Sequence, residues 1–378
     1  MQPQSNVVSR AVKMDKDPIR FIRSDFSDFI PYAGVESPEQ VSEILKIPIG
    51  SVIKLDANEN PYPPIAAILE AVSNAPLNVY PDPNQIFLRE SIASYVGVDP
   101  SQVVAGAGSD DLIDIVIRLL EPKMSVSAVP TFGMYKFLSN NSGIRHIEVG
   151  RNENFEIDIL EIEKAVLKGA NLILLASPNN PTGNSLRQDE IEKLVELDAV
   201  IVIDEAYAEF SRESVIPLIA KHPNLIVLRT FSKWAGLAGI RIGYSVSHSE
   251  FARRMMAIKQ PYNVSTVADV AARAALDHRV EVLDSVSLLI SERERLFKEL
   301  SEFSFFKVFP SDANFVLVQV LGKKAEDVVK FLRELGILVR YYNMPTLSGM
   351  IRISAGRPEQ TDALLKALRD FEENYVKA

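Results

Sequence analysis

The sequence of 378 residues contains no cysteine and only four histidines. Without cysteine the chain can form no disulfide, no thiolate nucleophile and no cysteine-ligated zinc site. The four histidines, His146, His222, His248 and His278, are far apart and show no metal-binding spacing, so we expect no metal site. No apolar run is long enough to span a bilayer, and we therefore expect no membrane partner.

Positive charge is also in short supply. Lysine and arginine number 41 against 50 aspartates and glutamates, and the net charge is −9. A protein with this balance has no global field that would attract nucleic acid, so an anionic ligand must be met by local basic residues. The first thirty residues carry Asp15, Asp17, Asp25 and Asp28 and no apolar stretch. This composition argues against a signal or transit peptide, and we expect a cytoplasmic protein.

From about Asn58 onward, short apolar runs alternate with amphipathic stretches. The apolar runs predict buried strands at 171–176, 199–203 and 225–228. Helical periodicity predicts helices at 110–120 and 189–197. Alternation of strands and helices over this length predicts an α/β domain with a mostly parallel sheet covered on both faces.

The last third of the chain has a different pattern. A long amphipathic stretch at 280–300 predicts a helix that bridges two domains. Beyond it we expect a helix at 325–335 and strands at 314–320, 337–339 and 350–353, which together form a small α+β domain. The predicted organisation is a flexible arm at 1–28, an N-terminal segment at 29–55 packing with the small domain, a large cofactor-binding domain at 56–284 and the small domain at 285–378.

Four polar segments follow strands of the large domain, and open α/β sheets bind ligands beyond the carboxyl ends of their strands. The segments are Gly106–Asp111, Ser177–Gly183, Asp204–Tyr207 and Thr230–Lys233, the last followed by Gly236, Gly239 and Arg241. Each has a simpler interpretation when taken alone. These interpretations are a capped turn, a rigid loop, a salt bridge or helix cap, and a solvated surface lysine.

Taken together, the four segments suit one task, which is to hold pyridoxal 5′-phosphate (PLP). Lys233 would form a Schiff base with the aldehyde of this cofactor, and Asp204 would keep its pyridine nitrogen protonated. Asn180 and Tyr207 would hydrogen-bond the phenolic oxygen, and Phe132 would stack on the ring. The candidates for the phosphate are Ser109, Asp110, Thr230, Ser232 and Arg241, together with the backbone of 106–110.

Further motifs extend the pattern over nearly the whole chain. They are Asp56–Tyr62 (Asp-Ala-Asn-Glu-Asn-Pro-Tyr), Tyr80–Pro83, Leu237–Gly243, Pro261–Val264, Ser311–Phe315, Ile337–Arg340 and Ile351–Ile353. With these motifs the chain resembles the fold-type I PLP-dependent aminotransferases, and most narrowly the histidinol-phosphate aminotransferases. The resemblance implies a mostly parallel seven-stranded sheet sandwiched by helices in the large domain, beside a small α+β domain.

The resemblance also implies roles for individual residues. Lys233, Asp204 and Tyr207 match catalytic positions, and Lys233 also shuttles the proton in a ping-pong reaction. Tyr80 matches a tyrosine that reaches the cofactor phosphate of the neighbouring subunit, which implies a homodimer with shared active sites. The positions that match substrate-facing residues are Tyr32, Asn58, Tyr262, Arg340 and Arg352. The implied reaction, in histidine biosynthesis, converts L-histidinol phosphate and 2-oxoglutarate to imidazole-acetol phosphate and L-glutamate, in either direction.

The sequence departs from the family pattern at three positions. Pro63 stands where glycine is usual, Phe132 where some members have tyrosine, and Asp111 where glutamate is frequent. None of these changes touches the lysine or its partners on the cofactor ring, and Phe132 keeps the stacking while losing a hydrogen bond.

Several other functions stay open at this point. The nearest is an aromatic amino acid aminotransferase of the same fold, and a PLP-dependent decarboxylase of a phosphorylated amino acid is a further one. A PLP-fold regulatory module is disfavoured because the chain has no room for a DNA-binding domain before Tyr32 and its net charge is negative. A nucleotide-binding protein is disfavoured because the turn at Gly106–Gly108 lacks the spacing of a dinucleotide or P-loop motif.

Overall fold

The computed structural model describes residues 18–26 and 34–376. Residues 18–26 belong to a unit separate from the rest of the chain and contain two short 3₁₀ helices, η1 (Pro18–Phe21) and η2 (Ser24–Phe26). The remaining description concerns residues 34–376. Tyr32 and most of the arm predicted at 1–28 lie outside the described residues.

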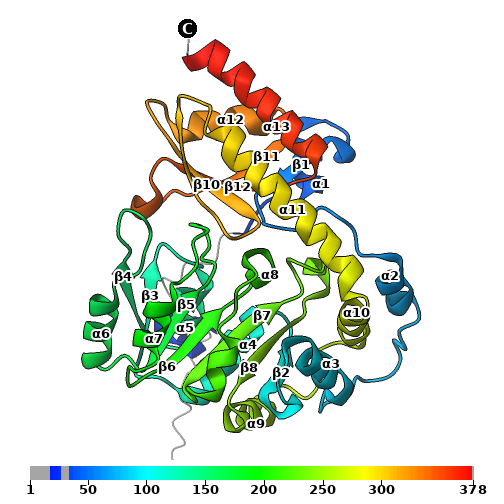
Figure 1. Cartoon of the computed structure of the whole chain (residues 1–378), viewed down its shortest axis with the longest axis vertical. Helices are drawn as coiled ribbons and strands as arrows, with labels where there is room; N and C mark the ends of the chain where they lie inside the picture. The colour runs from blue at the N-terminus through cyan, green and yellow to red at the C-terminus, as the bar shows by residue number, and fades with distance from the viewer. Residues whose placement is uncertain (1–17, 27–33, 377–378) are drawn as a thin grey trace, which may run out of the picture. The chain divides into compact units, whose positions relative to one another are not determined.

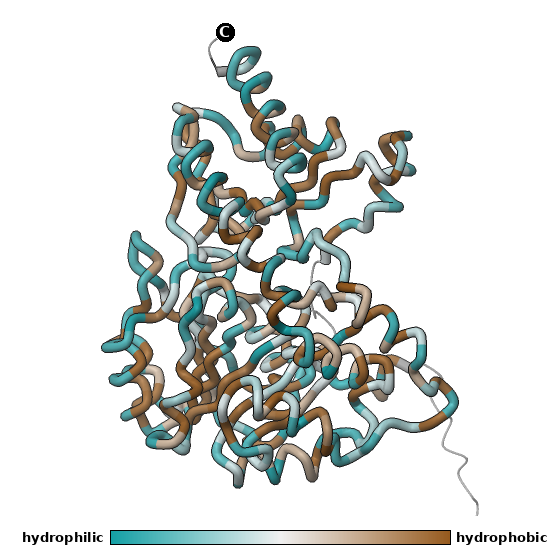
Figure 2. The backbone as a smooth tube through the Cα atoms, turned by 45° about the vertical axis from the view of Figure 1, so that its right-hand side comes forward, coloured by the Kyte–Doolittle hydropathy of each residue, from teal (hydrophilic) through white to brown (hydrophobic). Residues whose placement is uncertain are grey.

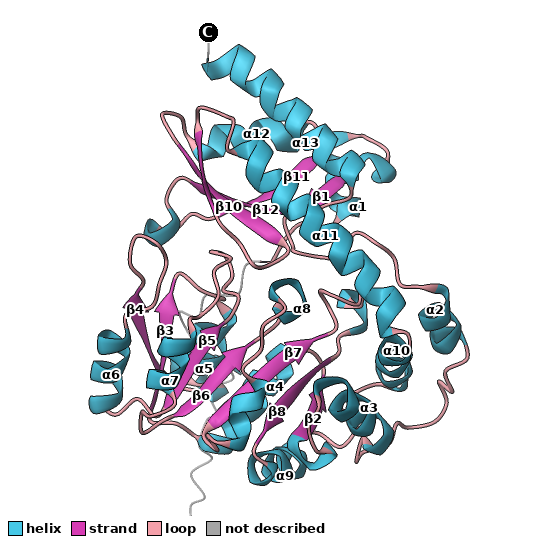
Figure 3. Ribbon diagram, in the orientation of Figure 1, coloured by secondary structure: helices cyan, strands magenta, loops and turns pink. Residues whose placement is uncertain are grey.

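A seven-stranded sheet forms the centre of the larger body (Figures 1 and 3). In spatial order its strands are β2 (Val103–Gly106), β8 (Gly243–Ser247), β7 (Leu225–Thr230), β6 (Val200–Asp204), β5 (Leu172–Ala176), β3 (Met124–Val129) and β4 (Arg145–Gly150). All neighbouring pairs run parallel except those of β8, which is antiparallel to β2 and β7. The predicted α/β fold with a mostly parallel seven-stranded sheet is therefore confirmed.

Helices cover both faces of this sheet. One face is covered by α4 (Ser109–Leu120), α5 (Met134–Asn141) and α9 (Ser249–Ile258). The other face and the sheet edges carry α2 (Ala66–Ser73), α3 (Ile86–Val96), α6 (Ile159–Leu167), α7 (Gln188–Leu194), α8 (Ala208–Ser211) and α10 (Thr266–Asp277), with the 3₁₀ turns η4 (Pro100–Gln102), η5 (Ile216–Ala220) and η6 (Ala238–Ile240). Within the described ranges, no helix is long and apolar enough to cross a membrane.

Two apolar clusters, one on each face, hold the sheet between its helices. Successive side chains of a strand point to opposite faces, so that Val202 of β6 packs in one cluster and Ile201 and Ile203 in the other. Figure 2 shows brown, hydrophobic stretches of backbone within the larger body. The same alternation places Asp204 on the face of Val202 and Glu205 on the opposite face, which determines which of the two carboxylates can join a site beside α4 and α5.

A second, five-stranded sheet forms the smaller body. In spatial order its strands are β1 (Ile53–Leu55), β11 (Ile337–Tyr341), β12 (Met350–Ser354), β10 (Phe315–Val320) and β9 (Phe306–Phe309). Helices α11 (Arg279–Leu300) and α12 (Ala325–Glu334) pack on it, and α13 (Pro358–Phe371) packs against both of these helices. The remaining elements are α1 (Pro38–Leu45), η3 (Ile49–Ser51), η7 (Pro345–Leu347) and η8 (Glu372–Val376). β1 precedes the large sheet in the chain but pairs with β11, in parallel.

Helix α11 connects the two bodies. It contacts α8 and α10 of the larger body and then β9, β10 and α13 of the smaller one (Figure 1). The predicted domain boundary at 284–285 falls inside this helix and stays a prediction. The helix predicted at 189–197 is shorter than expected, because the chain tightens after α7 into a turn in which Leu197 N donates to Leu194 O at 3.1 Å.

His146 on the edge strand β4 makes the stability of the fold depend on pH. Its ring nitrogens lie 2.8 Å from the hydroxyls of Ser125 and Ser127 on β3, and removal from water lowers the pKa of His146 to about 4. The unfolded chain therefore binds the proton first, and the contribution of His146 to stability is lost as the pH falls from about 6.5 to 4. We expect His146→Gln to remove up to ~3 kcal/mol of this pH dependence, measured by urea unfolding across that window. Equal slopes for parent and variant would contradict it.

Candidate functional site

Lys233 lies just beyond β7 with a half-buried side chain. Its Nζ donates a hydrogen bond to the backbone oxygen of Ala57, at 3.2 Å. Removal from water is the main cause that lowers the pKa of Lys233 to about 8; the charges of Arg352 and Arg241 act in the same direction, and Glu59 opposes them. A lysine with such a pKa serves as a nucleophile and a base near neutral pH.

Asp204 ends β6, and its carboxylate is buried. The hydroxyl of Tyr135 on α5 donates to its Oδ2 at 3.1 Å, and the backbone amide of Ala206 donates to its Oδ1 at 3.0 Å. Both donors are neutral, and burial raises the pKa of Asp204 to about 7. A buried carboxylate whose hydrogen-bond donors are neutral favours a cationic partner, such as a protonated ring nitrogen.

The turn Gly106–Gly108 leads into the N-terminus of α4, where Arg241 approaches it closely. A Cβ on Gly108, whose φ is +88°, would lie 2.5 Å from Arg241 Nη2, and a Cβ on Gly243 would lie 2.9 Å from the amide nitrogen of Ser109. Arg241 Nη2 also donates to Asp110 Oδ2 at 3.3 Å. Glycine is therefore required where the guanidinium and the first amides of a twelve-residue helix come together, an arrangement suited to an anion.

Two hydroxyls lie beside Lys233 in the same loop. Thr230 Oγ1 donates to Ser232 Oγ at 2.9 Å and accepts from the amide of Ser232 at 3.1 Å. Both side chains are buried. They offer further hydrogen-bonding groups at the same strand end as Lys233.

Asn58 joins the two bodies at the site. Its Nδ2 donates to the hydroxyl of Tyr207 at 2.9 Å, while Ser354 Oγ of β12 accepts from its backbone amide at 3.0 Å and donates to its Oδ1 at 2.9 Å. Asn314 Nδ2 donates to its backbone oxygen at 3.1 Å. Asn58 is buried and has a positive φ of 53°, a conformation that asparagine tolerates better than most residues. Burial also raises the pKa of Tyr207 to about 12.

Arg352 reaches the site from the smaller body. Its Nη1 donates to Asn180 Oδ1 and its Nη2 to the backbone oxygen of Asp56, both at 2.5 Å. Its Nε is buried without a hydrogen-bond partner. The Cα of Arg340 is paired with that of Arg352 across β11 and β12, and both guanidinium groups lie within 6.0 Å of the ring of Tyr342. Two arginines side by side can bind a phosphate or a carboxylate with the same planar fork.

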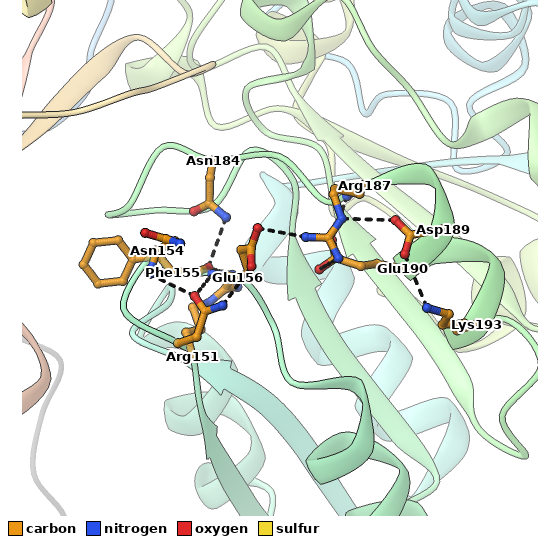
Figure 4. Close-up of polar contacts among 10 residues, drawn as sticks. Arg151, Asn154, Phe155, Glu156, Asn184, Arg187, Asp189, Glu190 and Lys193 are labelled. Atoms are coloured by element: carbon orange, nitrogen blue, oxygen red, sulfur yellow. Dashed lines mark hydrogen bonds and ion pairs between the residues drawn. The ribbon is translucent and has the colours of Figure 1, made fainter.

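The loop that carries Asn180 is held by bonds to its own body. Asn179 Nδ2 donates to Pro130 O at 3.0 Å and to Thr182 Oγ1 at 2.7 Å. The oxygen of Phe155 accepts from Asn184 Nδ2 at 3.1 Å and from Arg151 Nη1 at 2.9 Å (Figure 4). In the same figure Arg187 Nη1 donates to Glu156 Oε1 at 2.9 Å. Asn180 thus projects toward Arg352 from a rigid support.

Two predicted residues lie together but away from these contacts. The rings of Tyr80 and Tyr262 stack with centroids 4.5 Å apart and an interplanar angle of 19°. They are 77% and 48% exposed, which marks them as surface groups. Across the described ranges, no hydrogen bond or ring contact links this pair to Lys233 or Asp204. Tyr32 lies outside the described residues.

Tyr135 is a site residue that the sequence reasoning missed. It follows Phe132 by three residues, and the two rings meet edge to face with centroids 5.7 Å apart. The signal was available, because the spacing of three residues places both rings on one side of the start of α5. Ser354 was missed as well, although it lies two residues after Arg352 and so on the same face of β12.

Within residues 18–26 and 34–376, no group of three or more histidines, aspartates or glutamates is arranged to hold a metal ion. The candidate site consists of the amine of Lys233, the buried carboxylate of Asp204, the glycine turn at 106–108 with Arg241, and the two arginines Arg340 and Arg352.

Comparison with known proteins points in one direction. Residues 50–368 match the family model described as aminotransferase class I and II. A histidinol-phosphate aminotransferase of Roseiflexus castenholzii is 45% identical over 361 residues, which cover 92% of this chain and 97% of the relative. The chloroplastic histidinol-phosphate aminotransferase of Nicotiana plumbaginifolia is 40% identical over 357 residues, covering 93% of this chain and 86% of the relative.

A solved structure shares the fold as well. The crystal structure of histidinol-phosphate aminotransferase from Sinorhizobium meliloti, in complex with pyridoxal-5′-phosphate, superposes with a TM-score of 0.81 at 28% identity. The match covers 92% of this chain and 98% of that one. Similarity therefore extends over both bodies.

Proposed function

Because the chain belongs to the class I and II aminotransferases, and within them to the histidinol-phosphate aminotransferases, we propose that it transfers the amino group of L-histidinol phosphate to 2-oxoglutarate. The products are imidazole-acetol phosphate and L-glutamate, and the reaction runs in either direction. The family and the fold implied by the sequence motifs are confirmed. The observation that supports the proposal is the pairing of Arg340 with Arg352 across β11 and β12, with Arg352 bonded to Asn180 at the sheet edge beyond which Lys233 lies.

PLP is the cofactor that fits these residues. Its protonated ring nitrogen suits Asp204, whose buried carboxylate accepts only from neutral donors, and its phosphate suits the glycine turn below Arg241. When bound, PLP supplies an electron sink next to the substrate carbon that reacts. The residues proposed to hold it are Ser109, Asp110, Phe132, Asn180, Asp204, Tyr207, Thr230, Ser232, Lys233 and Arg241.

The residues of the chain divide the remaining work. Lys233 would hold the cofactor covalently, and its neutral amine would take the proton from the carbon of the substrate that carries the amino group. Asp204 would balance the positive charge of the protonated ring nitrogen. Asn58 keeps the hydroxyl of Tyr207 oriented through the 2.9 Å hydrogen bond, and Arg352 keeps Asn180 oriented in the same way. These contacts also exclude water, since Asn58, Tyr207 and Arg352 are buried.

The arginine pair is proposed to recognise the acidic ends of both substrates. Arg352 has a buried Nε without a hydrogen-bond partner, and Arg340 lies opposite it in the sheet. A guanidinium fork binds the phosphate of one substrate and a carboxylate of glutamate with the same geometry. One pocket can therefore serve both halves of the reaction.

We also propose a homodimer in which Tyr80 and Tyr262 reach the neighbouring site. The exposed apolar side chains near this pair support it. They are Leu77, Val79, Tyr80, Phe87 and Tyr262, each between 48% and 77% exposed. An apolar surface of this kind is typical of a face covered by another protein chain. A cytoplasmic location stays a prediction of the sequence.

The proposed function is tested by comparing amino donors for the same enzyme preparation. We expect kcat/KM for L-histidinol phosphate to exceed that for phenylalanine by ~10- to 100-fold, because only the phosphate engages both arginines fully. A preference for phenylalanine would instead identify an aromatic aminotransferase, and release of carbon dioxide would identify a decarboxylase.

The same comparison in an Arg352→Ala variant tests the recognition of phosphate. We expect KM for L-histidinol phosphate to rise by ~10- to 100-fold, and PLP affinity to fall far less, through the lost bond to Asn180. Arg293→Ala is the matched control, since Arg293 is also a buried arginine of the smaller body and donates to the backbone oxygen of Ala313. Loss of PLP and substrate in equal measure would show that Arg352 is structural.

A further inference from the structure

Three polar side chains form a chain of hydrogen bonds between the glycine turn at 106–108 and the Tyr80–Tyr262 pair. They are Gln85, Asn263 and Asp111, and they come from three separate parts of the sequence. Gln85 is buried, and so are its two hydrogen bonds to β2. The hydrogen bonds made by Asn263 and Asp111 are partly buried. None of the three has a part in the proposed chemistry.

Gln85 takes the place of a missing strand beside β2. β2 is an edge strand, so one of its sides has no neighbouring strand among the described residues. On that side the Gln85 side chain bonds the backbone of Ala105. The amide of Ala105 donates to Gln85 Oε1, and Gln85 Nε2 donates to the oxygen of Ala105, both at 3.0 Å. Gln85 Nε2 also donates to Asn263 Oδ1 at 3.1 Å. The backbone of Gln85 has a positive φ of 55°, so its own conformation is constrained as well.

Asn263 connects Gln85 to the glycine turn through Asp111. Its Nδ2 donates to Asp111 Oδ2 at 2.9 Å and to the oxygen of Ala105 at 3.3 Å. The same oxygen of Asp111 accepts from the amide of Ala107 at 2.9 Å, and a Cβ on Gly106 would lie 3.0 Å from it. The position of this one carboxylate oxygen therefore shapes the turn, and Asn263 orients it.

The other end of the chain of bonds reaches the aromatic pair. Asn263 directly follows Tyr262, and the amide of Gln85 donates to the oxygen of Asp82, two residues after Tyr80, at 3.1 Å. Tyr80 and Tyr262 stack on each other, so Asn263 on one side and Gln85 on the other both help to position the same aromatic pair.

We propose that Asn263 is a positioning residue that holds the glycine turn and the Tyr80–Tyr262 pair in one arrangement. The glycine turn that binds the phosphate in one active site and the aromatic pair that reaches the neighbouring site are then positioned by the same residue. A displacement of the turn would therefore displace the aromatic pair, and the reverse. This inference rests on the proposed function, because it takes the turn as the seat of the PLP phosphate and the aromatic pair as part of the partner's site.

Asn263→Asp tests the inference with almost no change in shape. The substitution replaces the two hydrogens of Nδ2 by an oxygen that faces Asp111 Oδ2 and the oxygen of Ala105. We expect PLP to dissociate ~10-fold faster or more. Trp234, the single tryptophan and the neighbour of Lys233, gives a fluorescence signal for this that needs no amino donor.

Rescue and control variants separate positioning from stability. Adding Asp111→Asn to Asn263→Asp restores a donor opposite an acceptor but takes away the oxygen that accepts from the amide of Ala107, so we expect only part of the PLP retention to return. Asn224→Asp is the matched control, because Asn224 Nδ2 donates to the oxygens of Val195 and Ala199 at 3.0 and 3.1 Å, away from the turn. It should lower the Tm without changing PLP dissociation. Unchanged PLP dissociation in Asn263→Asp, or PLP dissociation in Asn224→Asp as fast as in Asn263→Asp, would overturn the inference.

Mixed dimers test whether the effect crosses between subunits. A dimer with Lys233→Ala in one chain has a single working site, and Asn263→Asp can be placed in either chain. In the working chain it should weaken PLP retention through the glycine turn, whereas in the inactive chain it should raise substrate KM and weaken PLP retention less, through the Tyr80–Tyr262 pair. Parental KM and PLP retention with the substitution in the inactive chain would overturn the coupling. A preference for another amino donor would change the proposed function and leave this result standing.

Discussion

Replacing Lys233 with alanine is expected to lower the transamination rate by about four orders of magnitude or more. The amine of Lys233 has two tasks, since it carries the cofactor and moves the proton at the α-carbon of the substrate. Its pKa of about 8 leaves a useful fraction of neutral amine near physiological pH. No compensating amine is expected, because the neighbouring hydroxyls of Thr230 and Ser232 can form neither the covalent link nor an equivalent base.

The measurement combines turnover with the near-visible absorbance band of lysine-bound PLP, which the variant should lose. Lys259→Ala is the matched control. Lys259 is buried, removal from water lowers its pKa as it does for Lys233, and its Nζ donates to the oxygens of Pro261 and Gln260 at 3.0 and 3.3 Å. It should keep the band. Turnover in Lys233→Ala at the parental rate would refute the assignment.

The meeting of polar segments at one sheet edge could be predicted from the sequence alone. Asn180, Asp204 and Lys233 each follow an apolar strand, and parallel strands end at the same edge. The choice between Asp204 and Glu205 was harder. Strand alternation places them on opposite faces, but only the helices that cover each face show that Asp204 meets Tyr135 while Glu205 pairs with Arg229.

Contacts between residues far apart in the sequence could not be predicted from sequence patterns. Asn180 and Arg352 are separated by 172 positions, and Asn58 and Ser354 by 296. Their hydrogen bonds depend on how the smaller sheet is placed against the larger one, which no local propensity specifies. Gln85 illustrates a further limit, because nothing in its neighbourhood indicates that its side chain pairs with a strand. The resemblance to a family supplied the roles of Arg340 and Arg352, whereas composition and periodicity did not.

Asp204→Asn is expected to have effects of opposite sign on catalysis and on the stability of the cofactor-free protein. For catalysis, the substitution removes the buried anion that holds the charged ring nitrogen. Breaking a buried pair of this kind costs about 3–5 kcal/mol, which corresponds to a loss of roughly 10²- to 10³-fold in kcat or more. PLP affinity should fall as well, because the same interaction contributes to binding.

For the cofactor-free protein the sign reverses. The pKa of Asp204 is raised from an ordinary value near 3.8 to about 7, so the folded chain keeps a proton that the unfolded chain releases. Stability is therefore lost as the pH rises from about 4 through 7. Asparagine has no charge to bury, and the variant should be more stable than the parent at pH 8 by on the order of 4 kcal/mol, with no difference at pH 4. Urea unfolding of the cofactor-free proteins at both pH values measures this.

Glu205→Gln separates this effect from a general effect of removing a buried charge. Glu205 lies next in the chain and is also buried, but its carboxylate is 2.8 Å from Arg229 Nη2 and accepts from the amide of Val215 at 2.6 Å. Its neutralisation removes the nearer carboxylate partner of the buried Arg229 guanidinium and leaves Glu209, whose Oε1 lies 3.3 Å from Nη1, so it should destabilise the protein by about 3 kcal/mol. If Asp204→Asn destabilised the cofactor-free protein in the same way, Asp204 would already be compensated and would have no need of a cationic ring. A stabilising Asp204→Asn beside a destabilising Glu205→Gln would mean that the fold provides a cationic partner for Glu205, Arg229, but none for Asp204. The cationic partner of Asp204 would then be the cofactor.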